Sequence, residues 1–108
     1  MKSIYISLPI TGQEATYEER LNASVAYVNE KYPEYELIVT PKEFAEDLDE
    51  NWWRHGKPKY SDYLAGYIIA IKHCDAIFMC KGWEHSKGCK DEHAFANAIG
   101  IEIIYQQF

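Results

Sequence analysis

Residues 75–80 read Asp-Ala-Ile-Phe-Met-Cys. After Asp75, residues 76–80 form an uninterrupted apolar run, and Lys81-Gly82 follows it. Runs of this kind are typical of strands that are buried on both faces, as strands of parallel sheets are. Residues 3–8, Ser-Ile-Tyr-Ile-Ser-Leu, form a second candidate strand, which Pro9 closes. These two stretches predict two strands of one parallel sheet.

The flanking segments alternate between short strand-like runs and longer stretches with helical spacing, which favours a parallel sheet with crossover helices. Further strands are expected at residues 35–40 and 101–105, and helices at about 17–32, 60–73 and 88–99. Right-handed crossovers then permit the strand order 2-1-3-4. The prediction is an α/β fold, a three-layer sandwich of the flavodoxin-like or Rossmann-like kind with about four strands.

Two local signals bear on the helix ends. Thr16 precedes Glu19 by three residues, which predicts a capping box at the start of the first helix. Gly100 follows the last helix, where a glycine commonly ends the helix in the left-handed conformation.

Bulk properties limit the classes of function. The 108 residues, 47% of them hydrophobic, suit a single domain over residues 1–108. With 17 acidic and 11 basic residues the formal net charge is -6, so no nucleic acid polymer is expected as a partner. The apolar runs are far shorter than the roughly 20 residues that cross a bilayer, and Met1-Lys2 leads into a strand without a signal-peptide pattern. We expect a cytoplasmic protein with no membrane partner and with reduced cysteines.

Glu92 is the most informative polar residue. It lies in the first turns of the last helix, and Ala96 and Gly100 follow at four-residue steps, so this side of the helix can approach the sheet closely. Ligands of open α/β sheets bind at the carboxyl ends of the strands, where Glu92 is expected to lie. An acidic residue near a helix start is also favourable in itself, so position alone leaves both interpretations open. Tyr5 could bring a phenol to Glu92, or serve only as a core aromatic.

Residues 81–88, Lys-Gly-Trp-Glu-His-Ser-Lys-Gly, form the loop before that helix. Its glycines, its serine and the free helix start suit an anion or a sugar hydroxyl, and Trp83 could stack on a ring. A plain connection between strand and helix has the same composition.

Cys80, His85, Cys89 and His93 lie within fourteen residues, and cysteine and histidine are the side chains that zinc prefers. Their spacing matches no finger pattern, and the set is divided between a strand, a loop and a helix. No metal and no cofactor is therefore expected. A nucleophilic pair of Cys89 with His93 or His85 lacks a nameable orienting partner, and Cys89 is explained as a small helix residue.

Three blocks of sequence carry a family resemblance. They are Tyr5-Ile6-Ser7-Leu8-Pro9-Ile10-Thr11-Gly12, then Cys74-Asp75-Ala76-Ile77, and then Gly82-Trp83-Glu84-His85-Ser86-Lys87-Gly88-Cys89 with Glu92 and Ala96. Over nearly its whole length the chain resembles the DUF4406 group of the nucleoside 2-deoxyribosyltransferase-like superfamily.

That resemblance implies an N-ribosyl or N-deoxyribosyl transferase or hydrolase that acts on a nucleoside or nucleoside monophosphate. Glu92 is matched to the glutamate that attacks the anomeric carbon and forms a covalent sugar intermediate, and Tyr5 to the tyrosine that orients it. The substrate-binding residues that we expect are Pro9, Gly12, Gly82, Trp83, Ser86, Lys87 and Gly88.

One position departs from the pattern of those enzymes. They commonly carry an acid on the preceding helix where this chain has Tyr67, and a phenol with a pKa near 10 is a poor proton shuttle at neutral pH. Glu43, Asp47 or Asp49 could replace that acid. The alternatives are a non-catalytic module that binds nucleotides and a small oligomeric adaptor without a ligand. Trp52, Trp53 and many tyrosines further predict a homodimer or a higher oligomer.

Overall fold

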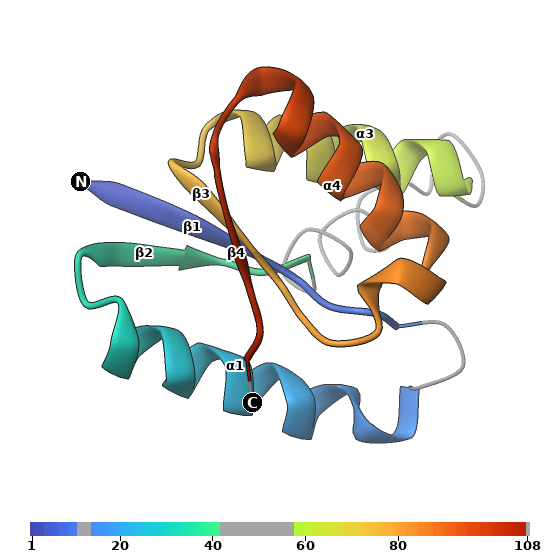
Figure 1. The fold of residues 1–108 in the computed structure, drawn as a ribbon. Helices are drawn as coiled ribbons and strands as arrows, with labels where there is room; N and C mark the ends of the chain where they lie inside the picture. Colours follow the sequence, from blue (N-terminus) through green and yellow to red (C-terminus); the bar gives the residue numbers. More distant parts are fainter. Residues whose placement is uncertain (11–13, 42–57, 108) are drawn as a thin grey trace.

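A four-stranded parallel sheet lies at the centre of the protein, in the order β2-β1-β3-β4 (Figure 1). The computed structural model describes residues 1–10, 14–41 and 58–107. The elements in chain order are β1 (Lys2–Ser7), the 3-10 turn η1 (Glu14–Thr16), α1 (Tyr17–Lys31), β2 (Tyr35–Val39), α3 (Tyr60–Lys72), β3 (Ala76–Met79), the 3-10 turn η3 (Trp83–His85), α4 (Lys87–Ile99) and β4 (Glu102–Tyr105). The predicted strand order and the parallel pairing are confirmed.

The helices cover both faces of the sheet, which gives three layers. Helix α1 lies on one face, and α3 and α4 lie side by side on the other (Figure 1). The residues of β1 alternate between the two layers: Ile4 and Ile6 pack in the cluster that includes Leu21 and Val28 of α1, whereas Tyr5 packs with Ile71 of α3. Successive side chains of a strand point to opposite faces of the sheet, so β1 contributes to the core on both faces.

Strand β3 is fully buried, with all four of its side chains inaccessible to solvent, as its apolar run predicts. It pairs with β1 so that Tyr5 lies opposite Ile77 and Ser7 lies opposite Met79. Asp75 fixes this register at the amino end of β3: its carboxylate accepts a hydrogen bond from the Ser3 amide at 2.8 Å, and its own amide donates to the Ser3 carbonyl at 2.9 Å.

The two predicted helix signals have different outcomes. Gly100 ends α4 in the left-handed conformation, with φ 78°, as predicted. The capping box at Thr16 was a wrong prediction, because Thr16 has φ -110° and ψ 7° and is not extended, so its hydroxyl makes no cap hydrogen bond. That hydroxyl instead accepts a hydrogen bond from Arg20 Nε at 3.0 Å.

In the part of the chain that the structure describes, every helix is too short or too polar to cross a bilayer.

Candidate functional site

The Glu92 side chain lies between α4 and the carboxyl end of β1, and it is only 4% exposed. Ser86 starts the helix that positions it: the serine is extended, and its Oγ accepts a hydrogen bond from the Cys89 amide at 3.3 Å. The side of α4 that faces the sheet carries Cys89, Glu92 and Ala96, and two of these three side chains are small. The helix can therefore approach the sheet closely enough to bury a carboxylate.

Two hydroxyl groups from β1 hold the carboxylate. Tyr5 Oη donates to Glu92 Oε2 at 2.5 Å, and Ser7 Oγ donates to Glu92 Oε1 at 2.8 Å. Tyr5 and Ser7 are two residues apart on one strand, so their side chains emerge on the same face of the sheet. Each carboxylate oxygen thus accepts a hydrogen bond from β1, which fixes the plane of the group relative to the strand.

Burial dominates the titration of this group. It raises the pKa of Glu92 from 4.5 to about 7, although the hydrogen bonds from Tyr5 and Ser7 oppose the rise; the nearby charge of Asp91 adds to it. Burial and the adjacent Glu92 carboxylate also raise the pKa of Tyr5 well above 10, so the phenol keeps its proton. At neutral pH the site therefore holds a protonated tyrosine and a glutamate close to its midpoint of ionisation.

Glu92 opens onto a pocket of about 410 Å³, which we call the Glu92 pocket. Its described lining is mostly apolar and phenolic, from Leu8, Ile10, Pro41, Tyr60, Tyr63, Tyr67, Ser86, Gly88, Cys89 and Glu92. The volume is within the usual range of small-molecule sites, and a mainly apolar lining with few polar groups is typical of them. Among the described residues of this lining, Glu92 is the one carboxylate.

Five of the seven predicted substrate-binding residues line two neighbouring spaces. Ser86 and Gly88 line the Glu92 pocket. Pro9, Gly82 and Lys87 line a neighbouring hollow of about 400 Å³, which Tyr60, His85, Ser86 and Gly88 also border and which we call the α4 hollow. Gly12 lies outside the described residues, as do Glu43, Asp47 and Asp49, which were considered as acids, and Trp52 and Trp53.

Trp83 does not line the Glu92 pocket. Its ring stacks on His93, with centroids 4.2 Å apart and an interplanar angle of 21°, and it lies 6.0 Å from the ring of Tyr105. His93 in turn hydrogen-bonds the Tyr105 hydroxyl at 2.8 Å. Trp83 was predicted to stack on a ligand, but in the structure it stacks on His93.

The cysteines and histidines do not assemble into one group. Among residues 1–10, 14–41 and 58–107, no three side chains of the metal-ligating kinds come together around a common point. Cys80 Sγ lies 3.4 Å from Ser24 Oγ, and burial raises the pKa of the Cys80 thiol to about 11. Burial also raises the pKa of Cys89, which does not favour a reactive thiolate.

Sequence reasoning missed Ser7 and the phenols of Tyr60 and Tyr63. The signal for Ser7 was present, because a residue two positions after Tyr5 must share its face of the sheet. The signal for the tyrosines was weak, since aromatic residues at helical spacing are more often part of a core.

A family model described as "domain of unknown function (DUF4406)" matches residues 2–105, nearly the whole chain. The chain belongs to the DUF4406 family. No curated protein and no solved structure gives a significant match.

Proposed function

We propose that this DUF4406 protein cleaves or exchanges the N-glycosidic bond of a nucleoside or nucleoside monophosphate, with Glu92 as the nucleophile. The observation that carries the proposal is the buried Glu92 carboxylate, which two hydroxyl groups hold where it opens onto a pocket of about 410 Å³. The reaction itself comes from the resemblance to nucleoside 2-deoxyribosyltransferase-like enzymes, whose nucleophile is matched by Glu92.

The proposed reaction consists of two displacements at the anomeric carbon. A carboxylate oxygen of Glu92 bonds to that carbon while the carbon–nitrogen bond breaks, and the electron pair of the broken bond leaves with the base, which takes up a proton. Water or a second base then attacks the same carbon, gives up a proton and releases the carboxylate, so the configuration is retained. Tyr5 and Ser7 support this role because they orient the carboxylate without neutralising it.

The pH profile follows from the environment of Glu92. Only the ionised carboxylate is a nucleophile, and burial raises the pKa of Glu92 to about 7. We therefore expect kcat/KM to rise as the pH increases through about 7.

The test uses a panel of nucleosides and their monophosphates, with chromatography to detect the free base. Glu92→Gln keeps the shape of the side chain but removes the charge that attacks, so turnover should fall by several orders of magnitude while binding persists. Glu84→Gln is the matched control, because Glu84 is exposed and lies outside the Glu92 pocket. Equal turnover by wild type and Glu92→Gln would show that Glu92 is not the nucleophile.

A second candidate function is a module that binds nucleotides without turning them over. Tyr67 favours it, because this phenol lines the Glu92 pocket on the helix where the enzymes that the chain resembles carry an acid. Binding of a panel compound without release of base by wild type supports this candidate. Recovery of base release in Tyr67→Asp would then identify a chain that has lost its acid.

A further inference from the structure

Tyr60 lies on the boundary between the Glu92 pocket and the α4 hollow. It is the first residue of α3, and it borders both spaces together with Ser86 and Gly88. The two spaces are therefore neighbours at the start of α4, and Tyr60 is the side chain from the opposite helix that reaches this boundary.

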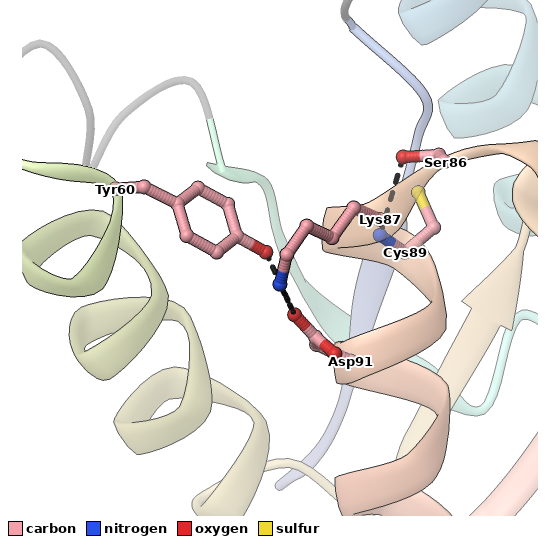
Figure 2. A network of polar contacts seen from close by, with 5 residues as sticks. All are labelled: Tyr60, Ser86, Lys87, Cys89 and Asp91. Carbon is pink, nitrogen blue, oxygen red and sulfur yellow. Dashed lines mark hydrogen bonds and ion pairs between the residues drawn. The ribbon is translucent and has the colours of Figure 1, made fainter.

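Side chains of α4 hold the Tyr60 ring in place. Tyr60 Oη donates to Asp91 Oδ2 at 2.9 Å, and Lys87 Nζ reaches the same oxygen at 3.1 Å (Figure 2). The Lys87 ammonium also lies 4.8 Å from the centroid of the Tyr60 ring. Exposed contacts of this kind are individually weak, but here all of them position one ring.

The hydroxyl end of Tyr60 passes close to the backbone of α4. A Cβ atom built at Gly88 would lie 3.7 Å from Tyr60 Oη, which is an ordinary contact distance. The side chain therefore spans the space between α3 and the first turn of α4, as Figure 2 shows. Tyr60 is 45% exposed, so a ligand that enters from solvent can reach it.

We propose that Tyr60 is a specificity-determining residue, whose ring separates the Glu92 pocket from the α4 hollow and limits the pocket to a nucleoside without a bulky extension. The inference rests on the proposed function for the identity of the ligand. Without the ring, the two spaces become one groove, and an extended nucleoside can occupy both parts.

The test measures calorimetric binding of adenosine, N6-benzyladenosine and 5′-O-benzoyladenosine, which extend the ligand at opposite ends. Wild type should bind adenosine at least about tenfold more tightly than either extended compound. Tyr60→Ala should abolish that preference for at least one of them. Tyr63→Ala is the control, because Tyr63 lines the Glu92 pocket but does not border the α4 hollow. This substitution should weaken the binding of all three compounds without changing the ratios of their affinities. An unchanged preference in Tyr60→Ala overturns the proposal.

A second readout needs no ligand. Cys89 lines the Glu92 pocket and is 2% exposed, whereas Cys74 and Cys80 do not line it. Labelling by a bulky maleimide, followed by mass spectrometry, should be at least about tenfold faster at Cys89 in Tyr60→Ala, with Cys74 and Cys80 unchanged. If no nucleoside binds to any variant, the proposed function fails and this labelling alone decides. If the labelling rate of Cys89 is unchanged, or if it increases equally at all three cysteines, the proposal that Tyr60 separates the two spaces is wrong.

Discussion

Glu92 is a buried carboxylate that lines a pocket of about 410 Å³. A buried carboxylate normally needs compensation for its lost hydration. Here Tyr5 and Ser7 each supply one hydrogen bond, yet burial still outweighs them and leaves the pKa of Glu92 at about 7. A core built only for stability would gain more from an apolar residue at this position, so the retained carboxylate is consistent with a functional role.

The raised pKa of Glu92 predicts how stability depends on pH. The unfolded chain has the ordinary pKa of 4.5 and the folded protein a pKa of about 7. Between these values the folded protein binds more protons than the unfolded chain, so the free energy of unfolding falls as the pH rises. The contribution is fully present below 4.5 and lost above 7, and it is on the order of 3 kcal/mol.

Urea unfolding of wild type and Glu92→Gln, at about pH 4 and about pH 8, measures this contribution. The glutamine does not titrate, so wild type should lose stability relative to the variant as the pH rises. A difference between the two proteins that is the same at both pH values would contradict the raised pKa.

At the scale of single elements, α4 determines the geometry of the site. Ser86 fixes where the helix starts, Gly100 fixes where it ends, and the small residues Cys89 and Ala96 allow Glu92 to approach β1. The chain can then turn directly into β4, which pairs with β3. Helix α4 thus connects β3 to β4 and also supplies the carboxylate.

Substitution of Gly100 tests the end of α4. Among the residues that the structure describes, no atom beyond the adjoining residues lies within 4 Å of a Cβ atom built there, so the cost of a side chain is the backbone conformation at φ 78°. Gly100→Ala should lower the free energy of unfolding by roughly 1 kcal/mol. Gly100→Asn should lose less, because asparagine tolerates the left-handed conformation better. Urea unfolding measures both variants, and equal stability of Gly100→Ala and wild type would contradict this account.

At the scale of the whole molecule, the layers bring α3 and α4 together over one face of the sheet (Figure 1). Residues of both helices line the Glu92 pocket, together with Leu8 just after β1. The same layer leaves apolar side chains in solvent: Ile69 of α3 is 58% exposed, and Ile99 of α4 is 41% exposed. Exposed apolar side chains that form one continuous patch are typical of surfaces that associate.

We expect a homodimer that uses this helical layer. Light scattering at micromolar concentration should give about twice the chain mass of 12.6 kDa. Ile69→Glu should shift the mass toward the monomer, because burial of a charge in an apolar interface is unfavourable. A wild-type mass of 12.6 kDa at that concentration would contradict the expectation.

The sequence by itself determined the strands, the crossover topology and the end of α4. The strand-like run at Ser3–Leu8 closed by Pro9, the apolar run at Ala76–Cys80 and the glycine after Ile99 are local patterns, and local patterns decide burial and backbone conformation. They also placed Glu92 beside the sheet, since small residues at four-residue steps identify the face of a helix that packs closely.

Apart from Tyr5, which the sequence already suggested as a partner of Glu92, only the tertiary structure decided which side chains meet at the site. Tyr5 and Ser7 are 87 and 85 residues from Glu92, and Tyr60 is 31 residues from Asp91. Whether such side chains touch depends on the register of β1 against β3 and on how α3 and α4 pack. The same packing turned Trp83 onto His93, away from the Glu92 pocket. Spacing along the chain does not encode these contacts, because they arise from the summed packing of elements that are far apart in sequence.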